Sequence, residues 1–280
     1  MVEFTKAFVI GHPIAHSRSP LIHNHWLKSL GLDGSYEAID VPPGALAKFL
    51  TRVRSGEFAG GNVTVPLKEE AFAVVDCLTD TANSIGAVNT VYMEDGKLWG
   101  DNTDAYGFSA NLASKAPEWR TAKTALVIGA GGAARAITKS LMDAKADKIY
   151  ILNRTLSRAE ALAASFGPLV SAAPLGDFAE YLRDADLIVN TSSLGMAGKP
   201  ALDFDFSAAK PSALATDIVY VPLETAFLKS ARETGLKTVD GLGMLLHQAV
   251  PGFKRWFGVR PEVTPELRAI IEADLFRVKP

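Results

Sequence analysis

The chain has 280 residues, and two domains are expected because domains usually hold roughly 100 to 200 residues. Its content of 48% hydrophobic and 21% charged residues excludes a disordered chain. A formal net charge of −2 with scattered lysines and arginines excludes nucleic acid as a partner, and the lack of an apolar run of about 18 residues argues against a membrane span.

The N-terminal sequence MVEFTKAFVIGHP lacks the basic start and the long apolar core of a signal peptide. Cys77 is the only cysteine, so neither an intramolecular disulfide nor a cysteine-rich zinc site can form. The spacing of His12, His16, His23 and His25 matches no common metal-ligand pattern. We therefore expect a cytoplasmic protein without a bound metal.

Up to about residue 100, short β-rich runs alternate with helical patterns, which is typical of an α/β sheet covered by helices. Strands are expected at Lys6–Ile10, Tyr36–Val41, Gly60–Val65, Ala87–Met93 and Lys97–Gly100. Three helices are expected in this part of the chain. The first has Ser19 as its N-cap and Pro20 as its first helical position, and it ends at Gly31. The second covers Leu46–Val53 and ends at Gly56, and the third begins at Pro66. The Asp95-Gly96 pair predicts a tight hairpin between the last two strands.

A second α/β pattern follows a helix over Ala105–Lys115 and an expected linker over Ala116–Thr121. Parallel strands joined by crossovers are expected at Thr124–Ile128, Lys148–Leu152, Leu187–Asn190 and Ala213–Asp217. Two helices, near Gly243–Trp256 and Thr264–Phe276, close the chain.

The most informative motif is a glycine-rich turn between a strand and a helix. The residues that follow the strand at 124–128 are Gly129, Ala130, Gly131, Gly132, Ala133 and Ala134. The first glycine allows a tight turn, the second lets the backbone approach a pyrophosphate, and the final alanine lets the helix lie close to the strand. A glycine-rich loop without a ligand is the alternative, but the strand before it and the helix after it favour a dinucleotide site.

The end of the next strand distinguishes NAD from NADP, because an acid there binds the ribose 2′-hydroxyl whereas arginines accommodate a 2′-phosphate. This position holds Asn153, Arg154 and Thr155, with Arg158 one helical turn later. A solvated helix start is the alternative, yet cations are disfavoured at a helix N-terminus unless an anion is present. The pattern favours NADP.

Four further segments place polar residues at or just beyond predicted strands, where open α/β sheets bind ligands: residues 11–20, 62–68, 86–90 and 100–104. Lys68 lies in the first turn of a predicted helix, where the macrodipole opposes its charge and poises it for proton transfer. Taken alone, Lys68 is better explained as an ordinary exposed lysine, and Asp104 is explained at least as well as an N-cap for the helix that begins at Ala105. Asn89 and Asn102 are similarly explained as turn residues.

Together these segments resemble the shikimate dehydrogenase family, over essentially the whole chain from the Gly-x-Pro-x-x-His-Ser-x-Ser-Pro start at Gly11 to Asp240–Leu245. The resemblance implies an α/β fold with two domains. Residues 1–104 and 241–280 would form a substrate-binding domain with a mixed sheet, to which the C-terminal helices return. Residues 105–240 would form an inserted, Rossmann-like NADP domain.

The resemblance also implies the site residues. Lys68 and Asp104 would be the catalytic pair, and both would contact the substrate. The other implied substrate contacts are Ser17 and Ser19 for the carboxylate, Thr64, Asn89 and Gln248 for hydroxyls, and Tyr220 near the nicotinamide. The implied NADP contacts, besides the glycine-rich turn from Gly129 to Ala133, are Asn153, Arg154, Thr155, Arg158, Thr191, Ile218 and Gly241.

The implied activity is the reversible reduction of 3-dehydroshikimate to shikimate by NADPH, a step toward chorismate and the aromatic amino acids. Shikimate and 3-dehydroshikimate would be the small-molecule partners, and the protein would be a monomer or a homodimer. Two alternatives stay open: a quinate/shikimate dehydrogenase that tolerates NAD, and a nucleotide-sensing module without catalysis. Such a module need not keep Lys68 and Asp104 together.

Overall fold

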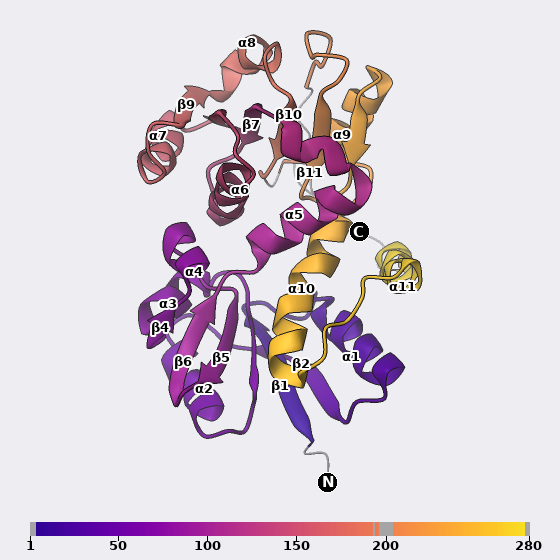
Figure 1. Ribbon diagram of the computed structural model, residues 1–280. Helices are drawn as coiled ribbons and strands as arrows, with labels where there is room; N and C mark the ends of the chain where they lie inside the picture. Colours follow the sequence, from indigo (N-terminus) through magenta and orange to yellow (C-terminus); the bar gives the residue numbers. More distant parts are fainter. Residues whose placement is uncertain (1–3, 193, 196–203, 278–280) are drawn as a thin grey trace. The chain divides into compact units, whose positions relative to one another are not determined.

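The computed structural model describes residues 4–192, 194–195 and 204–277, and Figure 1 traces them along the sequence. The chain divides into two compact units. The first contains Met1–Asp104 and Leu246–Arg277, and the second contains Ala105–Leu245. The second unit is thus inserted between the two parts of the first.

The first unit is built on a six-stranded mixed sheet with the strand order β2-β1-β3-β5-β6-β4. Its strands are β1 (Thr5–Gly11), β2 (Gly34–Asp40), β3 (Gly60–Val63), β4 (Cys77–Leu78), β5 (Thr90–Glu94) and β6 (Lys97–Asp101). β1 pairs in parallel with both β2 and β3, whereas β5 runs antiparallel to β3 and β6. The mixed sheet expected from the sequence is therefore present.

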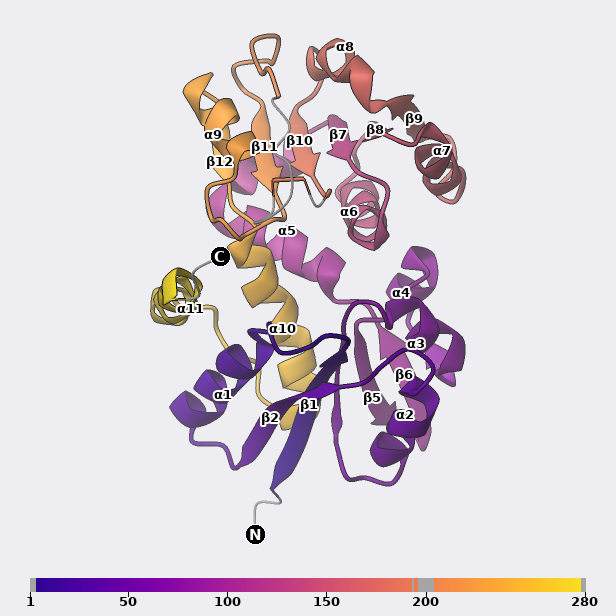
Figure 2. The same cartoon turned by 180° about the vertical axis from the view of Figure 1, so that it is seen from behind.

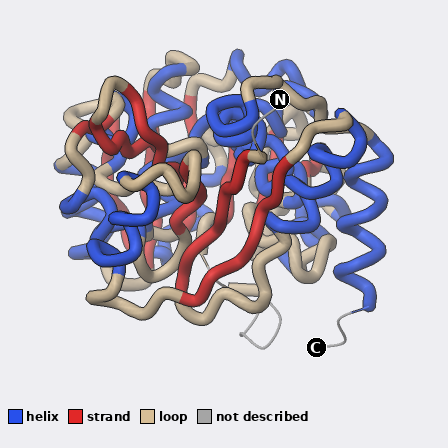
Figure 3. Tube along the Cα trace, turned by 90° about the horizontal axis from the view of Figure 1, so that it is seen from below, coloured by secondary structure: helices blue, strands red, loops and turns tan. Residues whose placement is uncertain are grey.

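Helices cover both faces of this sheet. They are α1 (Ser19–Leu30), α2 (Leu46–Arg54), α3 (Lys68–Val74), α4 (Asp80–Ile85), α11 (Pro265–Arg277) and, from Leu246 onward, α10 (Leu242–Phe257). Because side chains alternate along a strand, Phe8 and Ile10 pack in the cluster that contains α2 and α3, whereas Ala7 and Val9 pack with Trp256 of α10. Figure 3 shows the strands between helices on either side.

The second unit is built on a six-stranded parallel sheet with the order β12-β11-β10-β7-β8-β9. Its strands are β7 (Thr124–Ile128), β8 (Lys148–Asn153), β9 (Val170–Pro174), β10 (Leu187–Asn190), β11 (Leu214–Asp217) and β12 (Lys237–Val239). If these strands are numbered one to six in chain order and read from β9, their order is 3-2-1-4-5-6, which is typical of dinucleotide-binding sheets. The point at which the strand order reverses therefore lies between β7 and β10. The Rossmann-like topology expected from the sequence is confirmed.

Two layers of helices enclose the second sheet (Figure 2). The helical segments are α5 (Asp104–Lys115), η1 (Pro117–Thr121), α6 (Gly132–Asp143), α7 (Leu156–Ala164), η2 (Leu175–Asp177), α8 (Phe178–Leu182) and α9 (Ala226–Glu233). Val127 of β7 packs with α5, α6 and α7, whereas its neighbours Leu126 and Ile128 pack with α8 and α9. Among the described residues, no helix combines the length and the apolar character that a membrane crossing requires.

Three predictions about element boundaries were wrong. Ser19 is the first residue of α1 rather than its N-cap, which is Arg18 and makes no side-chain capping bond. Pro66 precedes α3 instead of opening it, because the helix begins at Lys68. Ala116–Thr121 is not a linker: Ala116 and Trp119 are buried in the core of the second unit, and Pro117–Thr121 forms a 3-10 helix.

Candidate active site

The structure brings Lys68 and Asp104 into direct contact, although they lie 36 residues apart in the sequence. Lys68 Nζ donates to Asp104 Oδ2 over 2.6 Å. Lys68 is the first residue of α3, and Asp104 is the first residue of α5, shortly after β6 ends. The side chains are 26% and 14% exposed, so the pair is sheltered but still open to a small molecule.

A second hydrogen bond fixes the other oxygen of the Asp104 carboxylate. Asn89 Nδ2 donates to Asp104 Oδ1 over 2.8 Å. Asn89 Oδ1 accepts from the backbone N–H of Thr103 and from the Thr90 hydroxyl, each over 2.8 Å, which determines the orientation of the amide. The carboxylate of Asp104 is thus engaged by side chains from elsewhere in the fold. The simple capping role considered for Asp104 is wrong.

The register of the sheet explains why these residues meet. Ile10 lies opposite Val63 in the parallel pair β1 and β3, so the segments that follow both strands emerge at the same edge. In the antiparallel part, Thr90 at the start of β5 lies opposite Asp101 at the end of β6. Residues 11–20, 64–68, 86–89 and 102–104 therefore gather along one edge of the mixed sheet.

The two serines expected to bind a carboxylate lie on the segment after β1. Ser17 Oγ accepts the backbone N–H of Ser19 over 3.3 Å, and the Ser19 side chain is nearly buried. Arg18, between them, turns to α11, where its Nε donates to Asp274 Oδ2 over 3.1 Å. Thr64 follows β3 at the same edge and is half-buried. Gln248 lies on α10 and is 9% exposed.

The glycine-rich turn of the second unit has the geometry of a phosphate-binding loop. Gly129 adopts φ 106°, and a Cβ there would lie 2.7 Å from Thr191 Oγ1, so only glycine fits. A Cβ on Gly131 or Gly132 would meet nothing within 4 Å, which leaves the N-terminus of α6 open to an anion. Ala134 is completely buried against the sheet, as the motif requires.

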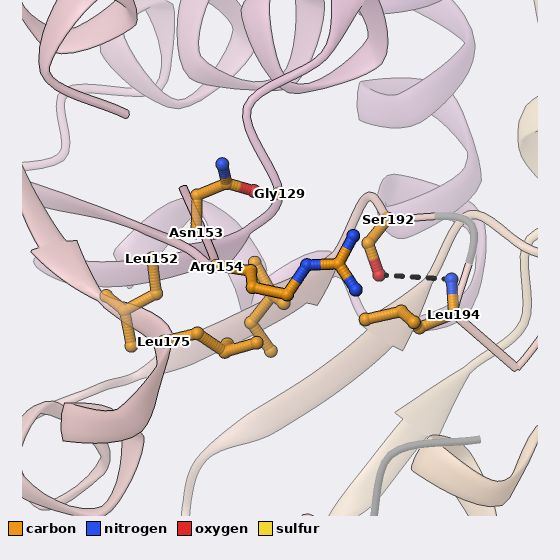
Figure 4. A pocket seen from close by; sticks show the side chains of 8 residues that line it. Gly129, Leu152, Asn153, Arg154, Leu175, Ser192 and Leu194 are labelled. Carbon is orange, nitrogen blue, oxygen red and sulfur yellow. Dashed lines mark hydrogen bonds between the residues drawn. The ribbon is translucent and has the colours of Figure 1, made fainter. Parts of the chain in front are cut away.

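A cavity of about 160 Å³ lies next to this turn. Its lining consists of Ile128, Gly129, Leu152, Asn153, Arg154, Leu175, Ser192 and Leu194. Figure 4 shows the Arg154 guanidinium extending across it toward Ser192. Arg154, Thr155 and Arg158 are exposed, and within the described part of the chain neither arginine forms an ion pair. The donors that would bind a 2′-phosphate are therefore available. Asn153 occupies the position at which an acid would repel that phosphate.

Sequence reasoning did not identify Asp217, a buried carboxylate at the end of β11. Burial raises its pKa to about 6, although the hydrogen bonds from Thr225, Val219 and Asn190 act to lower that pKa. The backbone N–H of Val219 donates to Oδ1 over 2.9 Å and Thr225 Oγ1 donates to Oδ2 over 2.7 Å. Its position, an acid at the carboxyl end of a predicted parallel strand, was the available signal.

Asp217 connects two loops that carry expected NADP contacts. Asn190 Nδ2 donates to Asp217 Oδ1 over 3.1 Å, while Asn190 Oδ1 accepts from the Ser192 backbone and hydroxyl in the cavity lining. Ile218 and Tyr220 follow Asp217 and are half-buried. A Cβ on Gly241 would lie 2.5 Å from the carbonyl carbon of Ile218, so a larger residue there would displace this loop.

The comparisons with known proteins agree with this arrangement. Residues 9–91 match the family model for the shikimate dehydrogenase substrate binding domain, residues 111–197 the model for shikimate/quinate 5-dehydrogenase, and residues 241–269 the model for the shikimate 5′-dehydrogenase C-terminal domain. A shikimate dehydrogenase (NADP(+)) from Brucella abortus (strain S19) is 56% identical over 278 residues, which are 98% of this chain and 96% of that protein.

Solved structures show the same relationship. The shikimate 5-dehydrogenase of Thermus thermophilus, in complex with NADP(H) and shikimate, has 41% identity and a TM-score of 0.85 over 98% of this chain and 99% of that one. The quinate dehydrogenase of Corynebacterium glutamicum, in complex with NAD, has 29% identity and a TM-score of 0.87 over 96% and 99%. The chain therefore belongs to the shikimate dehydrogenase family.

Proposed function

We propose that the chain is an NADP-dependent shikimate dehydrogenase, which reversibly reduces 3-dehydroshikimate to shikimate in the shikimate pathway. The observation that carries this proposal is the contact between Lys68 Nζ and Asp104 Oδ2 at the rim of the mixed sheet. Its support is the 56% identity to a shikimate dehydrogenase (NADP(+)) over nearly the whole chain. A nucleotide-sensing module is not favoured, since sensing requires no such pair.

The residues of the first unit would bind the substrate and move its proton. The Ser17 and Ser19 hydroxyls would donate to the substrate carboxylate, and Thr64, Asn89 and Gln248 would contact the ring hydroxyls. When shikimate is oxidised, Lys68 Nζ would take the hydroxyl proton as the carbon–oxygen bond becomes a carbonyl. Asp104 would orient this amine and stabilise the ammonium that forms. In the reverse direction the same ammonium would return the proton to the oxygen.

The residues of the second unit would bind the cofactor. NADP, when bound, would supply the hydride acceptor for the carbinol carbon of shikimate. The turn from Gly129 to Ala133 fits a pyrophosphate because its glycines leave open backbone at the N-terminus of α6. Asn153, Arg154, Thr155 and Arg158 would surround the 2′-phosphate. Thr191, Ile218, Tyr220 and Gly241 would lie beside the nicotinamide half.

The cellular setting is also part of the proposal. A cytoplasmic location is supported by Cys77 being the only cysteine of the chain, with its thiol free. A monomer or a homodimer is proposed as the functional form. Sedimentation velocity of the purified protein at several concentrations would distinguish the two.

The test is a comparison of four substrate pairs with the purified protein: shikimate or quinate, each with NADP or NAD, followed by the absorbance of the reduced nicotinamide. We expect kcat/KM to be highest for shikimate with NADP. Equal efficiency with quinate and NAD would favour the broader quinate/shikimate dehydrogenase. No reduction of either cofactor with either acid would contradict the proposal.

A further inference from the structure

A connected set of buried polar side chains lies behind the Lys68–Asp104 pair. Its members are Tyr36 of β2, Asn62 of β3, Thr90 of β5 and Asn89 just before β5, and each is 5% exposed or less. Burying polar groups in a sheet is costly unless they are all hydrogen-bonded, and an apolar interior would avoid that cost. These polar side chains are therefore expected to have a role besides stabilising the fold.

The hydrogen bonds of this set run in one direction, toward Asp104. Tyr36 Oη donates to Asn62 Oδ1 over 2.6 Å, and Asn62 Nδ2 donates to Thr90 Oγ1 over 3.2 Å. Thr90 Oγ1 then donates to Asn89 Oδ1 over 2.8 Å, and Asn89 Nδ2 donates to the carboxylate over 2.8 Å. Because these four bonds all point toward Asp104 and the last acceptor is a carboxylate, successive bonds polarise one another.

The other end of the set is the phenol of Tyr36, which donates to Asn62. Burial raises the pKa of Tyr36 well above its usual value, so the phenol keeps the proton that it donates to Asn62. His23 stacks on the Tyr36 ring, with centroids 3.9 Å apart and planes 7° from parallel, and holds the phenol in place.

We propose that Thr90, with Tyr36 behind it, is a positioning residue for the dehydrogenase reaction. Thr90 orients Asn89 and through it the Asp104 carboxylate, and Tyr36 orients Thr90 through the Asn62 amide. This inference rests on the proposed function, because it assigns Asp104 the role given above.

The test uses Tyr36→Phe and Thr90→Val, each of which removes one hydroxyl and keeps nearly the same side-chain volume. Because Thr90 acts through Asp104, its variant is expected to lower kcat by about 5- to 10-fold and to change KM less. Because Tyr36 reaches Asp104 only through Asn62 and Thr90, its variant is expected to lower kcat by about 3-fold and to change KM less. The KM for NADP should be unchanged in both.

Two further variants separate positioning from general damage to the fold. Tyr92→Phe is the matched control, since Tyr92 is also buried in this sheet and clusters with Tyr36 but makes no hydrogen bond to the described residues of the network. It should keep wild-type KM and kcat. Thr90→Ser, which retains the hydroxyl, should restore kcat. Thermal melting of all four variants shows that each is folded.

Values of kcat and KM within twofold of wild type for both Tyr36→Phe and Thr90→Val would overturn the inference and leave the proposed function intact. A loss in Thr90→Ser as large as in Thr90→Val would also overturn it, because the hydroxyl would then not be the cause. A wild-type protein that fails to oxidise shikimate would instead overturn the proposed function, and this inference with it.

Discussion

At the scale of single residues, the two serines after β1 are proposed to bind a carboxylate, a group that many enzymes bind with arginine. Ser17 is half-buried and Ser19 nearly buried, and Arg18 between them is bound to Asp274 rather than free for an anion. A hydroxyl that donates to a carboxylate contributes about 1.5 to 3 kcal/mol. In the proposed site, recognition of the substrate carboxylate would therefore depend on a few neutral donors.

We therefore predict that Ser17→Ala raises the KM for shikimate by roughly tenfold or more and lowers kcat much less. The reason is that the carboxylate is bound equally in the ground state and the transition state. Steady-state kinetics at saturating NADP measures both constants. An unchanged KM would remove Ser17 from the carboxylate site.

The cofactor preference is also proposed to depend on single residues. Arg154→Ala combined with Arg158→Ala should raise the KM for NADP on the order of 10²-fold, because two charge-assisted contacts to the 2′-phosphate are lost. The KM for NAD should stay nearly the same. Arg183→Ala, which removes another exposed arginine of the same unit, is the matched control. If the double variant loses NADP and NAD equally, the arginines do not distinguish the cofactors.

At the scale of secondary-structure elements, the packing of α1 on the first sheet should make the fold sensitive to acid. His23 is completely buried, neither ring nitrogen has a hydrogen-bond partner among the described residues, and burial lowers its pKa to about 3. The folded state thus binds the proton far more weakly than the unfolded state, whose histidine pKa is near 6.5. The contribution to stability is complete above pH 6.5 and is lost as the pH falls toward 3.

We predict that His23→Phe flattens this dependence. For the wild type, His23 alone should lower the free energy of unfolding by about 1.4 kcal/mol per pH unit between pH 6 and pH 4. Phenylalanine keeps the stack on Tyr36 but takes up no proton. Urea unfolding at several pH values measures both slopes, and the difference between them isolates the histidine. Parallel curves for the two proteins would show that His23 is not protonated on unfolding.

Most elements follow from local patterns, and those that do not are short or at an edge. Gly31 ends α1 in the left-handed conformation, and Asp95-Gly96 makes the hairpin turn with positive φ at both residues, as their residue types predict. Strands β4, β9 and β12 were not predicted. β4 has two residues and β12 three, and β9 (Val170–Pro174) contains two alanines and a proline, which have low β-propensity and are tolerated at a sheet edge.

The candidate site could be predicted only in part. The glycine-rich turn is continuous in sequence, so its chemistry can be derived from local spacing. The contact of Lys68 with Asp104 joins α3 to α5, and only the resemblance to a family suggested it before the structure. Asp217 and the buried set from Tyr36 to Asn89 depend on strand register, which no short motif encodes.

At the scale of the whole molecule, we propose that one unit binds the substrate and the other binds the cofactor. The proposed shikimate contacts lie mainly in Met1–Asp104 and Leu246–Arg277, whereas the proposed NADP contacts lie in Ala105–Leu245. We predict that shikimate alone slows amide hydrogen exchange mainly in the first unit and that NADP alone slows it mainly in the second. Hydrogen-exchange mass spectrometry with each ligand measures this. Protection of the first unit by NADP alone would contradict the assignment.

The Lys68 amine, held by Asp104, is proposed to transfer the proton that accompanies hydride transfer between shikimate and NADP. The most direct measurement is single-turnover NADPH formation from shikimate by Lys68→Ala, compared with the wild type. The variant should react about 10² to 10⁴ times more slowly, while its KM for shikimate changes far less. A rate close to that of the wild type would exclude Lys68 from the chemistry and contradict the account.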